Sequence, residues 1–200
     1  MLEYAKAADI CLTVAAVKNC LQANNCDNDS LIADCISEVK ERLSLKACAE
    51  RFPVSYENGM VITDFFAEST DKIGKYMHKC QEIKLFAATV GFDVDRLVEK
   101  YNSISMLKAY ITDAVASTAI EKWCELLCSR FAEREAHKGN VLLPRFSIGY
   151  GNTNIGIQKN ICDVLKTKEK IGLYLTDSML MLPQKSVTAI IPVITKTEAL

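Results

Sequence analysis

This 200-residue chain lacks an excess of charge of either sign, with 24 basic and 25 acidic side chains and a formal net charge of −1. Proteins that bind the phosphate backbone of nucleic acids usually carry a basic patch, and no cluster of lysine and arginine stands out here. The charge balance therefore argues against a nucleic-acid partner. Half of the residues are hydrophobic, which is typical of a globular protein with a sizeable core.

Long hydrophobic runs are also missing. The first twenty residues are rich in alanine, but Lys6 and Lys18 on one hand and Glu3 and Asp9 on the other interrupt every apolar stretch before it reaches the length of a membrane span. The same segment has no basic region followed by an apolar one, which is the layout of a signal peptide. We therefore expect no membrane partner and a cytoplasmic location.

Cysteine is plentiful, with nine residues, yet no pair has CxxC spacing. The odd number, the chain length and the missing export signal favour reduced thiols over disulfides. Cys124 and Cys128 stand one helical turn apart and could chelate a metal, but free thiols buried on a helix face are commoner, so we expect no metal site. Histidine is scarce: His78 and His137 offer little for a catalytic triad, and no catalytic residue is predicted.

Phosphate-binding motifs are absent as well. The sequence contains no GxxxxGK[ST] loop. The Gly149-Tyr150-Gly151 run is not the GxGxxG fingerprint of dinucleotide-binding folds, because no glycine stands three places beyond Gly151. A mononucleotide- or dinucleotide-binding fold therefore has no support.

What the sequence does contain is hydrophobic periodicity of both kinds. Helical spacing predicts helices over residues 1–22, 29–43, 69–80, 93–101 and 103–135, and a short helix after Asn154. Strands are predicted over residues 47–54, 60–63, 83–90, 171–175 and 187–191. The run 83–90 is apolar throughout and closed by Gly91, which indicates a central strand covered on both faces. Pro192 is expected to confine the last strand to a sheet edge.

These segments follow no regular βαβ rhythm, and no internal repeat, low-complexity tract or linker divides them. We therefore predict an α+β fold in which an antiparallel or mixed sheet packs with several helices, one of them long. The expected organisation is an N-terminal helical segment over residues 1–45 and an α+β domain over residues 46–200, together forming one compact unit.

The loop after Pro144 is the most distinctive stretch. Gly149 and Gly151 flank Tyr150, so the backbone there can take positive φ or approach another group closely. Arg145 stands four residues before Gly149, and its planar guanidinium suits a carboxylate held by two parallel hydrogen bonds. The alternative is a turn whose arginine pairs with a surface acid, and the residues alone favour that alternative.

The order and spacing of several motifs resemble the activation domain of cobalamin-dependent methionine synthase. The resemblance spans roughly residues 45–192, and the following segments carry it: Leu85 to Gly91 (LFAATVG), Asp113 to Glu121 (DAVASTAIE), Arg145 to Gly151 (RFSIGYG), the helix with Gln158, Gly172 to Met179 (GLYLTDSM) and Met181 to Val187 (MLPQKSV). That family binds S-adenosylmethionine in a shallow groove and presents it to cobalamin in the inactive cob(II)alamin state. An electron from a flavoprotein and the methyl group then restore methylcobalamin.

The resemblance implies a binding site for S-adenosylmethionine in this chain. By it, Arg145 would pair with the carboxylate of the ligand, the backbone around Ser147 would meet the adenine, and Tyr150 would pack against the ligand beside Gly149. In the family, an acidic group from the long helix also reaches the ligand, and here Glu121 is the candidate, one turn beyond the aligned Ser117. A guanidinium, an open backbone and an aromatic ring suit a ligand with a carboxylate, a sulfonium and a flat base.

The resemblance therefore implies a stand-alone reactivation subunit that serves a cobalamin-binding methionine synthase or another corrinoid protein, with a flavoprotein or a ferredoxin-type protein as reductant. No turnover is expected from the chain alone, because the chemistry resides in the cobalt and the sulfonium. One alternative is a non-catalytic module that grips a corrinoid protein without binding S-adenosylmethionine. Another is an α+β domain with an unrelated small-molecule pocket.

Overall fold

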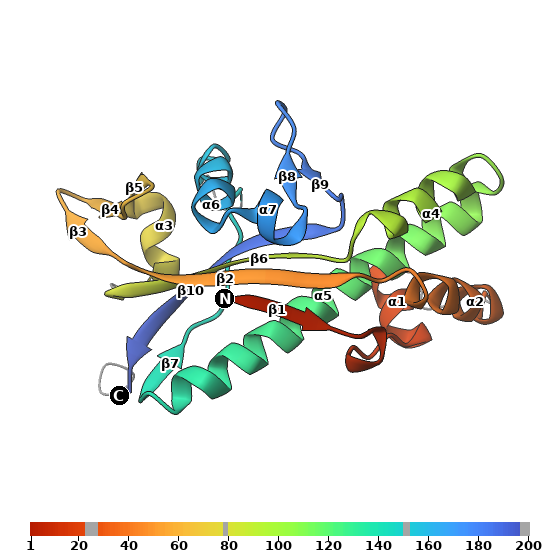
Figure 1. The fold of residues 1–200 in the computed structure, drawn as a ribbon, viewed down its shortest axis with the longest axis horizontal. Coiled ribbons are helices and arrows are strands. Elements are labelled where there is room, and N and C mark those ends of the chain that lie inside the picture. Colours follow the sequence, from red (N-terminus) through yellow and green to blue (C-terminus); the bar gives the residue numbers. More distant parts are fainter. Residues whose placement is uncertain (23–27, 78–79, 150–152, 197–200) are drawn as a thin grey trace.

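A computed structural model describes residues 1–22, 28–77, 80–149 and 153–196 (Figure 1). Its centre is a five-stranded sheet in which every neighbouring pair is antiparallel. In spatial order the strands are β1 (Leu2–Ala5), β2 (Leu45–Pro53), β6 (Glu82–Thr89), β10 (Ser186–Thr195) and β7 (Asn140–Leu142). The predicted α+β fold with an antiparallel sheet is therefore confirmed.

The long helix α5 (Met106–Ala136) packs across one face of this sheet (Figure 1). It was predicted from the periodicity of residues 103–135 and is confirmed almost to its ends. Ser105 caps it, because its hydroxyl accepts a hydrogen bond from the backbone N–H of Lys108. Three further helices pack against α5: α1 (Val14–Leu21), α2 (Asp29–Lys40) and α4 (Phe92–Asn102).

The opposite face of the sheet carries shorter elements (Figure 1). The helices are α3 (Thr70–Met77), α6 (Ile157–Leu165) and α7 (Thr167–Ile171). Two small antiparallel sheets accompany them: β3 (Ser55–Glu57), β4 (Met60–Ile62) and β5 (Ala67–Ser69) form one, and β8 (Tyr174–Leu175) and β9 (Met181–Leu182) form the other. The short 3-10 helix η1 (Ala7–Asp9) follows β1.

Strand β6 separates two hydrophobic cores. Its Phe86 and Ala88 belong to the core under α5, whereas Leu85 and Ala87 belong to the core under α6 and α7, and all four are fully buried. Because successive side chains of a strand point to opposite faces, a strand in the middle layer must be apolar throughout. The prediction of a central strand covered on both faces is confirmed.

Three local predictions were wrong. Residues 1–22 do not form one helix, because β1 pairs with β2 in the register Leu2↔Cys48 to Ala5↔Leu45, and α1 begins only at Val14. The predicted strand over residues 171–175 is shorter, because Ile171 ends α7 and only β8 is extended. Both errors arise because backbone pairing and packing override local propensity.

The third error concerns Pro192, which lies inside the sheet and not at an edge. The carbonyl of Pro192 accepts a hydrogen bond from the N–H of Leu143 at 3.0 Å, so its nitrogen also faces that side. There β7 has already ended at Leu142, and no neighbouring strand needs the N–H that proline lacks. Within the described part of the chain, no helix combines the length and apolar character needed to cross a membrane.

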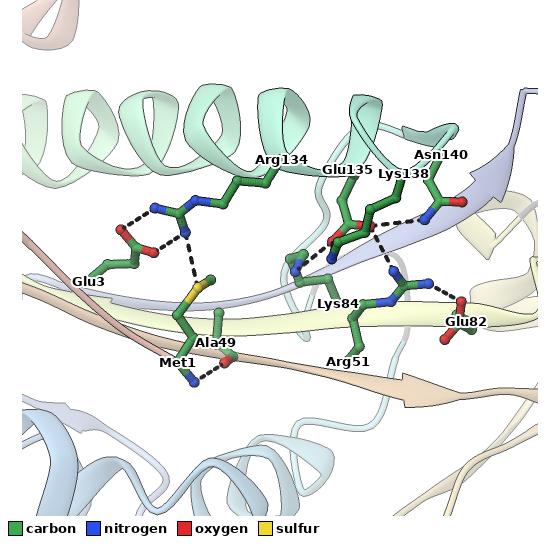
Figure 2. A network of polar contacts seen from close by, with 10 residues as sticks. All are labelled: Met1, Glu3, Ala49, Arg51, Glu82, Lys84, Arg134, Glu135, Lys138 and Asn140. Atoms are coloured by element: carbon green, nitrogen blue, oxygen red, sulfur yellow. Dashed lines mark hydrogen bonds and ion pairs between the residues drawn. The ribbon is translucent and has the colours of Figure 1, made fainter.

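A buried carboxylate joins the end of α5 to the sheet (Figure 2). Glu135 is only 1 % exposed. Its two carboxylate oxygens accept hydrogen bonds from Arg51, Lys138 and Asn140 and form an ion pair with Lys84, all at 2.7 to 3.3 Å. Burial alone would raise the pKa of Glu135, but hydrogen bonds from Asn140 and Lys138 and the charge of Lys84 outweigh it and hold the pKa at about 2. The network fixes α5 against β2, β6 and the start of β7.

Replacing Glu135 with alanine is expected to lower the free energy of unfolding by about 3–5 kcal/mol, because three cations and an amide lose their common acceptor in a buried site. Urea unfolding measures the loss. Glu133→Ala is the matched control: Glu133 lies two residues away on the same helix but is exposed, so its loss should stay within about 0.5 kcal/mol. Equal effects of the two substitutions would contradict the proposed anchoring role of Glu135.

The stability difference between the wild type and Glu135→Gln should depend on pH. The pKa of Glu135 is lower in the folded state than in the unfolded chain, so the stabilisation is complete above pH 5 and disappears as pH falls toward 2. Unfolding experiments at several pH values should show the two proteins converging in acid. A difference that stays constant from pH 6 to pH 2 would show that the charge of Glu135 contributes nothing.

Candidate functional site

A groove of about 630 Å³ opens where α5, α6 and the start of β10 meet the loop after β7. Its lining residues are Tyr76, Glu121, Arg145, Phe146, Ser147, Ile148, Gln158, Met181, Ser186, Val187 and Thr188. Three of the five residues predicted to bind a ligand, Glu121, Arg145 and Ser147, are therefore brought together at one groove. Segments that are far apart in the sequence supply them.

The loop after β7 is fixed by Phe146. Its backbone N–H and carbonyl exchange hydrogen bonds with Ile190 of β10 at 3.0 and 2.8 Å, and its ring stacks on Tyr76 of α3 with centroids 4.9 Å apart. Phe146 is buried, while its neighbours Arg145 and Ser147 remain partly exposed and line the groove. One aromatic anchor thus places both neighbouring residues at the site.

Arg145 pairs with Glu121 across the groove. The guanidinium Nη2 lies 2.5 Å from the Oε2 of Glu121, and the side chains are 25 % and 55 % exposed, respectively. This is the pairing with a surface acid that the residues alone favoured, but the acid is the one that the family resemblance picked out. A cation and an anion therefore stand side by side where a ligand could reach both.

The segment before β10 is held in a similar way. Lys185 contacts Asp113 of α5 at 2.8 Å and donates a hydrogen bond to the hydroxyl of Ser117 at 3.0 Å. The backbone N–H of Gln184 donates to Asp95 of α4 at 2.7 Å. Burial raises the pKa of Asp95, although hydrogen bonds from the backbone N–H groups of Gln184 and Lys185 oppose the change. Together these contacts fix the segment that leads into β10, whose first residues line the groove.

Gly149 lies at the far end of the loop and does not line the groove. It has φ +99°, and its N–H donates to the hydroxyl of Thr153 at 2.8 Å. Glu68 of β5, which is 6 % exposed, accepts a hydrogen bond from the next N–H, that of Asn154, at 3.2 Å. Tyr150, the fifth predicted residue, lies outside the described residues, as does His78.

Sequence reasoning did not select Gln158 as a site residue. Its side chain lines the groove although the residue is only 4 % exposed, and it stands on α6 among the buried residues Ile157, Ile161 and Leu165. A glutamine at an apolar helical position is the signal that could have identified it. Thr188 and Tyr76 carried no comparable signal, because their places at the groove depend on tertiary packing.

Other hollows lie on the part of the fold that the structure describes. One of about 510 Å³ lies between α1, α5 and the start of β10, and it shares Glu121, Ser186 and Val187 with the groove, which it extends toward α1. A larger hollow of about 740 Å³ is formed by α6, α7 and β8 and contains none of the predicted residues. Both lysines and acids line it, among them Lys166, Lys168 and Glu169.

The thiols near the groove are protonated at neutral pH. Burial raises the pKa of Cys124 to about 12 and also raises that of Cys128, so neither supplies a ready thiolate for a metal. Among the residues that the structure describes, no three histidine, cysteine or acidic side chains gather in a way that could hold a metal ion.

Comparison with known proteins decides the family. The family model for the activation domain of vitamin B12 dependent methionine synthase matches residues 1–199. The chain belongs to this family. A solved structure, the MetH reactivation domain bound to AdoHcy, aligns with a TM-score of 0.67 and 14 % identity over 96 % of this chain and 77 % of that one. No curated protein matches the chain. The family resemblance inferred from the motifs is therefore confirmed, and the solved domain confirms the fold.

The positive φ of Gly149 generates a prediction for this activation domain. Gly149→Ala should lower the free energy of unfolding by about 1–2 kcal/mol, because a side chain is disfavoured at positive φ. The new Cβ would also lie 3.0 Å from Ile155 Cδ1. Gly139→Ala is the control for the added contact: it has φ +80° but nothing within 4 Å of the new Cβ, so its loss should come from φ alone and be smaller. Urea unfolding compares the two, and an unchanged stability of Gly149→Ala would contradict the cost assigned to its positive φ.

Proposed function

We propose that this activation domain binds S-adenosylmethionine in the groove at Arg145 and presents its methyl group to a corrinoid carried by a partner protein. The Arg145–Glu121 pair is the observation that carries the proposal. The amino-acid end of the ligand has a carboxylate and an ammonium on one carbon, and a guanidinium beside a carboxylate complements both charges. Arg145 would bind the carboxylate, and Glu121 would turn to the ammonium.

The rest of the groove suits the nucleoside. The backbone around Ser147 and the amide of Gln158 offer hydrogen bonds to the edge of a base. Met181, Val187 and Ile148 offer apolar surface to its faces. A volume of about 630 Å³ lies within the usual range of small-molecule sites. The open shape fits a cosubstrate whose methyl group must remain accessible to another protein.

The reaction itself would need the partner. Cob(II)alamin receives one electron from the reductant, a flavoprotein or a ferredoxin-type protein. The methyl carbon then forms its bond to cobalt with an electron pair from cobalt, while the carbon–sulfur bond breaks and leaves its pair on sulfur, so the products are methylcobalamin and S-adenosylhomocysteine. The activation domain supplies binding and orientation, and we expect no turnover without the corrinoid protein.

Arg145→Ala is expected to weaken the binding of S-adenosylmethionine by roughly 10- to 100-fold, because hydrogen bonds to a charged group contribute about 1.5–3 kcal/mol. Equilibrium dialysis with labelled ligand measures the dissociation constant. Arg96→Ala is the matched control, since Arg96 also pairs with an acid, Asp93, but on the exposed face of α4. Arg145→Lys should bind weakly too, because lysine keeps the charge but loses the planar fork. Absence of saturable binding by the wild type, or equal binding by Arg145→Ala, would refute the site.

A second candidate function is a corrinoid-protein interaction module that does not bind the small molecule. One observation favours it: Arg145 already has an anionic partner in Glu121, so the groove is electrostatically satisfied without a ligand. A pull-down that retains a cobalamin-loaded methionine synthase fragment, together with dialysis that shows no S-adenosylmethionine binding, would select this alternative.

A further inference from the structure

A strip of large apolar side chains is exposed at the beginning of α5. The strip comprises Ile104, Met106, Leu107 and Tyr110, which are 66 %, 83 %, 51 % and 61 % exposed, respectively. Single exposed apolar residues are common on protein surfaces, but here four fall within seven residues of sequence, and three of them stand on the first turns of one helix. Patches of this kind mark interaction surfaces.

The strip is presented by a well-anchored helix end. On the other side of the first turns, Lys108 contacts the carboxylate of Glu38 at 2.7 Å and lies over the ring of Tyr101, whose hydroxyl also donates to Glu38. Ala109 and Ile111 are buried in the core. The exposed side chains therefore belong to a fixed surface, which reduces the entropy lost when a partner binds.

The strip is continuous with the groove. Met106, Tyr110, Asp113, Ser117 and Glu121 recur at spacings of three or four residues, so they lie on one face of α5. At the rise of an α-helix, Tyr110 lies about 16 Å and Met106 about 22 Å along the axis from Glu121. Asp113, between them, is already paired with Lys185, so a protein that covers this face would bury no unpaired acid there.

We propose that this strip is a docking surface for the corrinoid-carrying protein, an inference that rests on the proposed function. The cobalt must reach the methyl group in an open groove, so the partner must cover the surface around it. A standard interface buries about 800 Å² on each partner, equivalent to a disc of about 16 Å radius, and a disc centred between Glu121 and Met106 covers both residues. Methionine and tyrosine, two of the exposed residue types of the strip, are enriched in such interfaces.

The test uses the double variant Met106→Ser/Tyr110→Ser. Its affinity for a purified methionine synthase fragment carrying cob(II)alamin should fall at least about tenfold, because two anchoring side chains are truncated. Its affinity for S-adenosylmethionine, measured by equilibrium dialysis without the partner, should not change. Tyr4→Ser is the matched control: Tyr4 is 56 % exposed, but it lies on β1, where Arg130 near the other end of α5 binds its carbonyl.

The outcomes separate this proposal from the proposed function. If the wild type does not bind S-adenosylmethionine, the function fails. If the wild type binds both ligand and cobalamin fragment and the double variant binds the fragment equally well, the docking surface is overturned while the function stands. Failure of the wild type to bind the fragment also overturns the docking surface. The docking surface is overturned too if sedimentation shows that the substitutions abolish self-association without affecting binding of the fragment, since the strip would then join two copies of this chain.

Discussion

The antiparallel pairing of β10 with β6 is the interaction on which the site depends. It runs from Ser186↔Thr89 to Val193↔Glu82. The other edge of β10 is therefore free to pair with another segment of the chain. That edge receives β7 and then the backbone of Phe146, which carries Arg145 and Ser147 into the groove. The first residues of β10 themselves line the groove. A shift of one residue in this register would turn every side chain of β10 to the opposite face of the sheet and remove these residues from the groove.

Helix α5 gives the site its second rigid component. One uninterrupted helix carries Glu135, the anchor to the sheet, near its end, Glu121 at the groove, and Tyr110 on the exposed strip near its beginning. Because the three residues stand on one continuous helix, their spacing along the chain is set by helical geometry. Fixing one end with a buried charge network therefore also fixes the position of the carboxylate that meets Arg145.

The sequence was sufficient for elements whose local signal agrees with their final environment. The period of α5 and the uniform apolar character of β6 predicted both elements, because each is specified by burial that repeats along the element. It was insufficient where pairing partners decide the structure: residues 2–5 form a strand only because the edge of β2 is available, and Pro192 is tolerated inside the sheet only because β7 stops at Leu142. The motifs indicated the family, whereas the contribution of Gln158 to the groove required the fold.

The pairing of Arg145 with Glu121 bridges residues too far apart in sequence for any local pattern to reveal, and its energetics bear on how a ligand would enter. Exposed ion pairs contribute about 0–1 kcal/mol, so exchanging this partner for another costs little. Before a ligand binds, Glu121 already holds the guanidinium of Arg145 at the groove. Less side-chain entropy is therefore lost when the ligand binds. A zwitterion would then replace one ion pair with two. A simple anion would have to compete with Glu121 and leave it unpaired, so this arrangement favours amino-acid-bearing ligands over plain carboxylates.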